Sequence, residues 1–243
     1  MKVLIALPAY NEEHGIASVL SSIINLREQS KYDIRVLVVN DGSTDETANI
    51  VQGMAYGRDY INLINHDVNK GLGKAVNTIL LYAIENLNND DILITLDADN
   101  THSPYLIENM IDHMMRNNLD LVVASRFTDG GREIGLSNIR KLYSRGAMYY
   151  FKLFFPIKNL NDYSSGYRAY NMGILREAYE KWNGLVTTSG FECMAEIAAK
   201  FSKMKIKAGE IPLVLRYDYK NGKSKMKVAS TIKGYFSLLS KVR

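Results

Sequence analysis

The feature that most constrains the fold is the alternation of strand-like and helix-like segments through the first half of the chain. Short runs dominated by Val, Ile and Leu lie at residues 2–7, 34–39, 61–64, 92–96 and 119–124. Amphipathic helical patterns fill the intervals, at about residues 14–29, 44–56, 73–88 and 104–118. Such alternation predicts a Rossmann-like α/β fold, a mostly parallel sheet with helices on both faces. In these sheets ligands bind beyond the carboxyl ends of the strands.

The second half of the chain is less regular and ends in basic residues. Residues 138–157 form an amphipathic segment rich in Tyr and Phe, which suits either a membrane interface or a core helix. Residues 226–242 form a second, basic helical pattern. Because no repeat or low-complexity linker divides the chain, we expect one α/β domain over residues 1–227 and a basic amphipathic C-terminal helix over 228–243.

Two aspartates, Asp97 and Asp99, directly follow the apolar run at 92–96. Side chains two residues apart in an extended segment point to the same side, so these carboxylates would converge beyond a buried strand. Like charges about 4 Å apart repel by roughly 4 kcal/mol at an effective dielectric near 20. A Mg²⁺ or Mn²⁺ ion shared with a phosphorylated ligand would offset that repulsion. A pair of turn or helix-capping aspartates is the alternative.

Charge is distributed unevenly along the 243 residues. Residues 200–243 hold twelve Lys and Arg against two acids, whereas the first 199 residues hold 18 basic and 24 acidic residues. This region predicts an anionic partner such as phosphate or lipid headgroups, although solvated surface charge gives the same pattern. Cys193 is the single cysteine, and no apolar run reaches the roughly 20 residues of a membrane span. With no room for a signal peptide before the first strand, we expect a cytoplasmic protein.

Several common ligand-binding motifs are absent. The segment Gly71-Leu72-Gly73-Lys74 is not a phosphate-binding loop, because that loop needs glycine where this chain has Val68. Val76 breaks a dinucleotide fingerprint at the same place. The four histidines lack metal-ligand spacing, and no G-x-S-x-G elbow occurs. These absences exclude P-loop kinases, ordinary dehydrogenases, zinc enzymes and α/β-hydrolases.

Five short segments together carry a family resemblance. They are residues 7–13 (LPAYNEE), 39–45 (VNDGSTD), 69–75 (NKGLGKA), 96–99 (LDAD) and 164–168 (SSGYR). With them the chain resembles family 2 glycosyltransferases of the GT-A fold, and among these the dolichol- and polyprenyl-phosphate mannosyltransferases and glucosyltransferases. The resemblance covers roughly residues 2–227.

The resemblance implies a site for a nucleotide-sugar donor. Its expected residues are Pro8, Tyr10, Glu12, Asp41, Lys74, Asp97, Ala98 and Glu192. Asp41 would accept hydrogen bonds from a nucleobase, and Tyr10 would offer a stacking face. Asp97, Asp99 and Thr101 would hold Mg²⁺ or Mn²⁺ against the donor diphosphate. The alternatives are a turn residue for Asp41 and a helix-surface glutamate for Glu192.

The resemblance also implies a site for an acceptor phosphate. Its expected residues are Arg126, Arg140, Arg168, Arg216, Lys223, Ser224 and Lys225. Arginine forks suit phosphate oxygens, and lysines add point charge. Asp99, Arg126 and Arg216 are the expected catalytic residues, and structural ion pairs are the alternative for both arginines.

The implied reaction is inverting transfer of a hexose from a donor of the GDP-mannose or UDP-glucose type to a polyprenyl or dolichyl phosphate. Such an acceptor needs no strong general base, because its second pKa of about 6 leaves it largely dianionic. One alternative is transfer to a hydroxyl of a soluble glycan or metabolite, with Glu192 or Asp162 as base. Another is a non-catalytic sugar-nucleotide-binding subunit of a membrane complex. Nucleic-acid binding is not expected, and the oligomeric state stays open.

The chain departs from these relatives at one metal position. Many mannosyltransferase relatives read DADLQHPP where residues 97–104 of this chain read DADNTHSP. Thr101 or a water molecule must therefore replace the glutamine ligand. No membrane-spanning segment follows residue 227, so we expect the aromatic segment and the basic tail to make a peripheral contact with the anionic, cytosolic face of a membrane.

Overall fold

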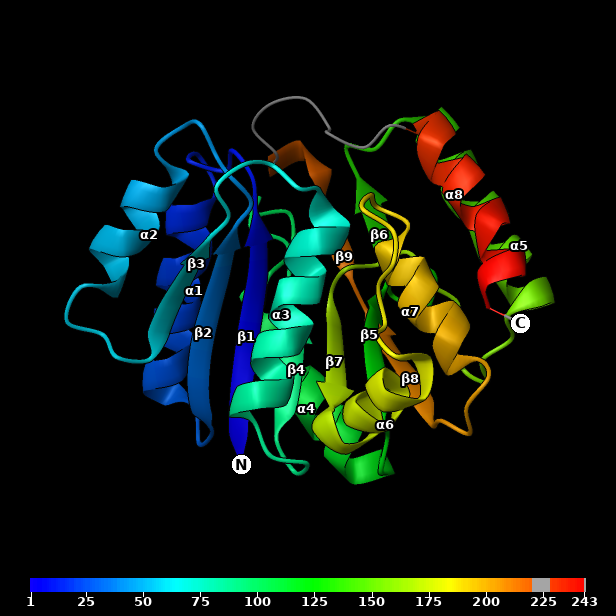
Figure 1. Cartoon of the computed structure of the whole chain (residues 1–243), viewed down its shortest axis with the longest axis horizontal. Coiled ribbons are helices and arrows are strands. Elements are labelled where there is room, and N and C mark those ends of the chain that lie inside the picture. Colours follow the sequence, from blue (N-terminus) through cyan, green and yellow to red (C-terminus); the bar gives the residue numbers. More distant parts are fainter. Residues whose placement is uncertain (220–227, 243) are drawn as a thin grey trace.

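Seven strands form a central sheet, and helices cover both of its faces (Figure 1). The computed structural model describes residues 1–219 and 228–242. The strands are β1 (Lys2–Ala9), β2 (Asp33–Asn40), β3 (Ile61–Asn65), β4 (Ile92–Thr95), β5 (Leu121–Ser125), β6 (Arg132–Ile134), β7 (Arg168–Asn171), β8 (Ala208–Pro212) and β9 (Val214–Arg216). The helices are α1 (Ile16–Gln29), α2 (Thr47–Ala55), α3 (Leu72–Asn86), α4 (Ile107–Asn117), α5 (Asn138–Phe154), α6 (Met172–Trp182), α7 (Cys193–Phe201) and α8 (Val228–Lys241).

The strand order of the large sheet is β3-β2-β1-β4-β7-β5-β8. The first four of these strands are parallel to one another, and β5 is parallel to β8. Strand β7 is antiparallel to both of its neighbours, β4 and β5. The prediction of a mostly parallel sheet is confirmed, and the five strands predicted in the first half are all present.

Alternation of side chains divides the core into two layers. On β1, Val3, Ile5 and Leu7 belong to the cluster that contains α1, α2 and α4. Leu4 and Ala6 face the opposite way, toward α3, α6 and α7. Both faces of the strand are therefore buried, which explains why its sequence is almost continuously apolar.

The carboxyl ends of β1, β2 and β4 lie at one edge of the sheet, at the top of Figure 1. The register pairs Ala9 with Asn40 and Ala6 with Thr95, so the segments that leave these strands begin side by side. Residues 10–13, 41–45 and 97–101 are thereby gathered at one place, as the sequence pattern predicts.

Helices α5 and α8 pack together at the side of the sheet. The Tyr150 hydroxyl donates to the Tyr235 carbonyl at 3.1 Å, and the ring of Phe151 lies 4.9 Å from that of Tyr235. On α8, Leu238 is fully buried and joins the core. On α5, Phe151 is the one fully buried residue, so one face of this helix joins the core and most of its other side chains lie outside it. The division of the chain at residue 227 stays a prediction.

None of the helices within residues 1–219 and 228–242 has both the length and the apolar character needed to cross a bilayer.

Candidate functional site

A cavity of about 1000 Å³ lies beyond the carboxyl ends of the strands. One part is lined by the segments that follow β1, β2 and β4. Its residues include Pro8, Tyr10, Glu12, Asp41, Asp97, Ala98, Asp99 and Thr101. The other part is lined by α5, α8 and the segment before α7. Its residues include Leu142, Tyr143, Gly146, Ala147, Tyr150, Phe191, Ile232 and Phe236. The cavity thus joins a polar compartment to a mainly apolar one.

The structure brings most of the predicted donor residues into the polar compartment. The β1–α1 loop that carries Tyr10 and Glu12 is fixed to the segment after β2. There the Asn11 amide donates to the Ser43 hydroxyl at 2.9 Å, and the Glu12 amide donates to the Thr47 hydroxyl at 2.8 Å. Asn11 has a positive φ of 50°, a conformation that asparagine tolerates better than most residues.

Asp41 lines the cavity but is almost fully buried. Its Oδ1 lies 2.6 Å from His66 Nδ1 and accepts the Lys70 amide at 3.0 Å. Its Oδ2 accepts the Gly71 amide at 2.8 Å. The carboxylate therefore organises the segment before α3 as well as facing the cavity, and both roles fit a residue at the end of a central strand.

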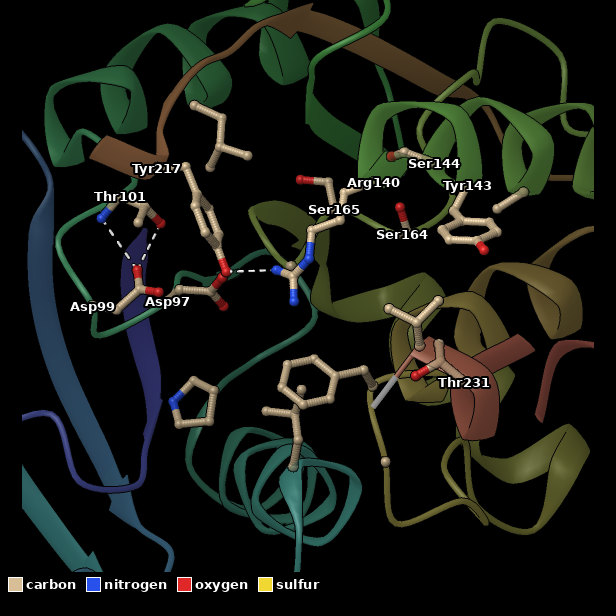
Figure 2. A pocket seen from close by; sticks show the side chains of 18 of the residues that line it. Asp97, Asp99, Thr101, Arg140, Tyr143, Ser144, Ser164, Ser165, Tyr217 and Thr231 are labelled. Atoms are coloured by element: carbon tan, nitrogen blue, oxygen red, sulfur yellow. Dashed lines mark hydrogen bonds between the residues drawn. The ribbon is translucent and has the colours of Figure 1, made fainter. Parts of the chain in front are cut away.

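Asp97 and Asp99 leave β4 on the cavity side, as Figure 2 shows. The Asp97 side chain is 44% exposed. A Cβ at Gly166 would come within 3.0 Å of Asp97 Oδ1, and one at Gly15 would come within 3.0 Å of the Ala98 carbonyl. Two glycines thus leave room on either side of this turn.

Thr101 is joined to Asp99 rather than standing apart from it. Its hydroxyl donates to Asp99 Oδ1 at 2.6 Å, and its amide donates to the same oxygen at 3.1 Å (Figure 2). A donating hydroxyl keeps its lone pairs, so Thr101 can still offer an oxygen to a cation. Its first effect, however, is to orient the Asp99 carboxylate.

The oxygen donors at this turn fit a hard divalent cation that is shared with a ligand. Within residues 1–219 and 228–242, no three His, Cys, Asp or Glu side chains gather in a way that could hold a metal by themselves. Mg²⁺ is commonly held by one or two carboxylates together with substrate phosphates and water. Asp97 and Asp99 meet that requirement, because both line the cavity and the Asp97 side chain is 44% exposed.

Arg126 forms a buried ion pair with Asp162. Its Nε and one terminal nitrogen each donate to a different Asp162 oxygen at 2.7 Å, and it also donates to the Ser164 hydroxyl. Burial alone would raise the pKa of Asp162, but the charge and hydrogen bonds of Arg126 outweigh it and hold that pKa below its ordinary value. Asp162 has no exposed surface, so it cannot serve as a base for an acceptor hydroxyl.

Arg140 is the second arginine that lines the cavity. It extends from α5 toward the carboxylate turn, and its guanidinium donates to the Tyr217 hydroxyl at 2.9 Å (Figure 2). In the same view Tyr143 and Ser144 of α5 lie opposite Thr231 of α8. Arg140 thus extends from α5, which lines the apolar compartment, into the polar compartment.

The prediction that Arg168 faces the acceptor is wrong. Arg168 is fully buried, and its guanidinium donates to the carbonyls of Ser165, Met194 and Tyr163 at 2.7–2.8 Å. Arg168 begins β7, and its buried guanidinium joins the segment at 163–165 to α7.

Other predicted residues lie apart from the cavity. Arg216 pairs with the Asp218 carboxylate at 2.8 Å and lies over the Tyr219 ring, so the ion-pair alternative describes it better than a catalytic role. Lys74 is exposed on the first turn of α3. Glu192 precedes α7 and packs against Gly190 and Gly234. None of the three lines the described part of the cavity. Lys223, Ser224 and Lys225 lie outside the described residues.

Two features of the site were not foreseen. The first is the contact between His66 and Asp41. The second is a buried ion pair of Glu196 and Lys200, which binds the segment at 187–188 that lies beside α3. Glu196 accepts from the amides and hydroxyls of Thr187 and Thr188. The next residue, Ser189, accepts the Gly73 amide at 3.0 Å. The four-residue spacing of Glu196 and Lys200 was a signal for an ion pair on one helix face.

The comparisons with known proteins agree with this architecture. Residues 4–181 match the family described as Glycosyl transferase family 2. The chain is 29% identical over 228 residues to dolichol-phosphate mannosyltransferase of Pyrococcus furiosus, in a match covering 93% of this chain and 60% of that protein. It is 26% identical over 226 residues to undecaprenyl-phosphate mannosyltransferase of Micrococcus luteus, covering 93% of this chain and 88% of the relative. The chain therefore spans about 60% of the length of the Pyrococcus protein.

A solved structure shows the same fold. Glucosyl-3-phosphoglycerate synthase from Mycobacterium tuberculosis, in complex with Mn²⁺ and UDP-glucose, superposes with a TM-score of 0.69 at 20% identity. The superposition covers 99% of this chain and 79% of that one. At this identity the likeness concerns the GT-A fold alone. The family match covers most of the chain and includes all five motif segments, so the chain belongs to glycosyl transferase family 2.

Proposed function

We propose that this protein transfers a hexose from a nucleotide sugar to a polyprenyl phosphate, with inversion and with a divalent cation. The observation that carries the proposal is the cavity itself, in which a pair of aspartates shares one space with a compartment walled by α5 and α8. A nucleoside diphosphate suits the first compartment and a hydrocarbon chain suits the second. The names of the Pyrococcus and Micrococcus relatives agree with this reading.

The chemistry follows from the charges that line the cavity. Mg²⁺ or Mn²⁺ bound by Asp97 and Asp99 would neutralise charge that develops on the leaving diphosphate. Arg140 extends toward the same turn, where its guanidinium can orient a phosphate oxygen for attack on the anomeric carbon. A dianionic acceptor is already a nucleophile, which fits the burial of Asp162 and the placement of Glu192 outside the described cavity lining.

A donor and acceptor panel tests the proposal. The protein is incubated with polyprenyl phosphate and with GDP- and UDP-sugars in the presence of Mn²⁺, and each reaction is repeated with chelator. We expect lipid-linked sugar from one donor and its loss on chelation. Transfer only to soluble hydroxyl compounds would replace this proposal with the hydroxyl-acceptor alternative. Nucleotide binding without any transfer would support the non-catalytic alternative.

Gly146 allows the acceptor compartment to be tested separately. It lies within α5, lines the cavity, and a Cβ added there meets nothing within 4 Å. Gly146→Phe should fold normally, because phenylalanine has a better helix propensity than glycine. The added ring narrows the apolar compartment, so we expect the KM for polyprenyl phosphate in detergent micelles to rise about tenfold. Donor affinity, measured by calorimetry, should stay unchanged.

The matched control for that variant is Gly53→Phe. Gly53 lies on α2, away from the cavity, and a Cβ there also meets nothing within 4 Å. We expect it to leave the KM unchanged. An unchanged KM in Gly146→Phe would mean that the acceptor does not occupy this compartment.

We also propose that α5 contacts an anionic membrane. Leu142, Tyr149 and Leu153 recur at spacings of seven and four residues, which places them on one face of the helix. Leu142 is 70% exposed and Leu153 is 74% exposed. The neighbouring face carries Lys141, Arg145 and Lys152 at the same spacings. An apolar face flanked by basic residues is typical of helices that lie in a membrane interface.

The position of this face supports the acceptor proposal. Leu142 lines the cavity as well as being exposed, so the apolar compartment opens onto the exposed face of α5. A polyprenyl chain held in a bilayer could then enter the cavity sideways while its phosphate approaches Arg140. The membrane contact and the acceptor site would form one continuous surface.

Vesicle sedimentation tests this contact. The double variant Leu142→Gln/Leu153→Gln removes apolar area without changing the charge. We expect it to bind vesicles of phosphatidylglycerol and phosphatidylcholine at least about tenfold more weakly than the wild type, since burying a leucine is worth about 1.5–3 kcal/mol. Met115→Gln, at an exposed methionine on α4, is the control and should bind normally. Equal binding by the double variant would contradict the proposal.

A further inference from the structure

We propose that His66 is a positioning residue that holds the Asp41 carboxylate in the one orientation that reads a nucleobase. This inference rests on the proposed function, because it assumes that a nucleotide occupies the polar compartment. It goes further in assigning a residue outside the family motifs described above and in stating which bases that residue selects.

His66 is buried between two elements of the donor site. It directly follows β3, and its side chain is only 8% exposed. Its Nδ1 lies 2.6 Å from Asp41 Oδ1, and its Nε2 lies 2.9 Å from the Thr78 hydroxyl on α3. The ring thus bridges the end of β2 to α3, across the segment that carries Lys70 and Gly71.

The hydrogen-bond inventory fixes the direction of the contact with Asp41. A carboxylate only accepts, so His66 Nδ1 must carry a proton and donate it to Asp41. The Thr78 hydroxyl lies 2.9 Å from His66 Nε2 and 3.1 Å from the Lys74 carbonyl. Whether it donates to the carbonyl or to Nε2, the proton on Nδ1 is required. In this arrangement the ring donates to Asp41 through Nδ1.

This donor decides which oxygen of Asp41 is available to a ligand. Oδ1 accepts from both His66 and the Lys70 amide, which occupies its two lone pairs. Oδ2 accepts the Gly71 amide and has one lone pair left among the described contacts. Without His66, the carboxylate could rotate and offer a differently placed acceptor to the cavity.

A single fixed acceptor selects bases that present a ring N–H. Uracil offers its N3–H and guanine its N1–H, whereas the corresponding ring nitrogens of cytosine and adenine are acceptors that would face the carboxylate lone pair. A site built to bind an N–H rejects an analogue that lacks it, because the buried acceptor is then left unpaired. His66 therefore supports preference for uridine and guanosine diphosphates over cytidine and adenosine diphosphates.

The test measures base selectivity instead of overall activity. Affinities for UDP, GDP, CDP, ADP and inorganic pyrophosphate are measured by calorimetry with Mn²⁺, for the wild type and for His66→Phe, His66→Asn and Thr78→Val. In His66→Phe we expect the preference for the better of UDP and GDP over CDP to fall at least about tenfold, with pyrophosphate affinity unchanged. His66→Asn keeps a donor near the position of Nδ1 and should restore most of the preference. Thr78→Val, which leaves Nδ1 in place, should keep it.

The outcomes separate this inference from the proposed function. If the wild type binds none of the nucleotides, the proposed function fails. If the wild type binds UDP or GDP selectively and His66→Phe keeps that selectivity, His66 has no positioning role. If His66→Phe also loses pyrophosphate binding, that variant has disturbed the whole site, and His66→Asn becomes the deciding variant. Failure of His66→Asn to restore base selectivity would overturn the inference.

Discussion

Replacing Asp99 with asparagine is expected to lower the rate of sugar transfer by about a hundred- to a thousandfold, because a bound cation contributes several kcal/mol and each 1.36 kcal/mol is tenfold in rate. Asparagine keeps an oxygen that can accept from Thr101 but removes the negative charge. The loss should appear both in turnover and in Mn²⁺-dependent binding of the donor nucleotide. Steady-state rates and calorimetry at several Mn²⁺ concentrations measure the two effects.

Two other aspartate variants serve as comparisons for Asp99→Asn. Asp97→Asn should give a loss of similar size, because Asp97 lines the cavity beside Asp99 and its side chain is 44% exposed. Asp59→Asn, at an aspartate that is 92% exposed beside Arg35, should leave the rate unchanged. A rate that survives in both Asp97→Asn and Asp99→Asn would show that the turn is structural and that no cation is bound there.

Breaking the ion pair between Arg126 and Asp162 is expected to have the largest effect on stability. Each of Arg126→Met and Asp162→Leu leaves the partner charge buried, which costs about 3–5 kcal/mol. For a chain of this size that loss corresponds to a fall of roughly 6–20 °C in melting temperature. The double variant should recover part of the loss, because two apolar side chains replace the pair, while Glu133 loses its cation and the Ser165 amide loses its acceptor. Chemical unfolding of all four proteins gives the coupling free energy.

The same set of four proteins, a double-mutant cycle, also tests whether Arg126 contacts the acceptor. If the double variant folds and keeps the KM for polyprenyl phosphate, Arg126 is a structural residue. If the KM rises sharply in a folded double variant, Arg126 contacts the acceptor as well. If the losses of unfolding free energy in the two single variants simply add in the double variant, the two residues are not coupled and the pair does not stabilise the fold.

The pair also fixes how stability depends on pH. The pKa of Asp162 is lower in the folded chain than its ordinary value of about 3.9. Its contribution is therefore present above that value and is lost as the pH falls toward the folded pKa. Arg126 stays charged throughout this range, since its pKa is raised further by Asp162 against the opposing effect of burial.

The first half of the fold could be predicted because its inner strands are largely buried on both faces and are read directly from their apolar runs, while the edge strand β3 is partly exposed. The second half could not, because β6 and β9 have three residues each and β7 has four. Strand β7 begins with a fully buried arginine, which no apolar pattern predicts. Only the placement of three carbonyls around Arg168 explains its burial, and such an arrangement leaves no periodic signal in the sequence.

The candidate site divides in the same way. Asp41, Asp97 and Asp99 could be located because they directly follow strands, and strand ends gather at one edge of a parallel sheet. His66 could not, because its role depends on a partner 25 residues away. The ion pairs of Arg126 and Arg216 were weighed as alternatives, but their partners were not identified. Composition shows that arginines are present and does not show which carboxylates neutralise them.

The two compartments of the cavity are encoded in consecutive stretches of the chain. The polar compartment is built from residues 8–102, and most of the apolar compartment comes from residues 126–236. Later segments also reach the polar compartment: residues 187–190 rest on Gly71 and Gly73 at the start of α3, and Gly166 lies beside Asp97. Recombination after β5 would therefore exchange most of the apolar compartment while keeping Asp41, Asp97 and Asp99 of the polar one. A new pairing would need to preserve the insertion of β7 between β4 and β5, the pairing of β8 with β5, and the close fit of Thr188 and Ser189 against Gly71 and Gly73.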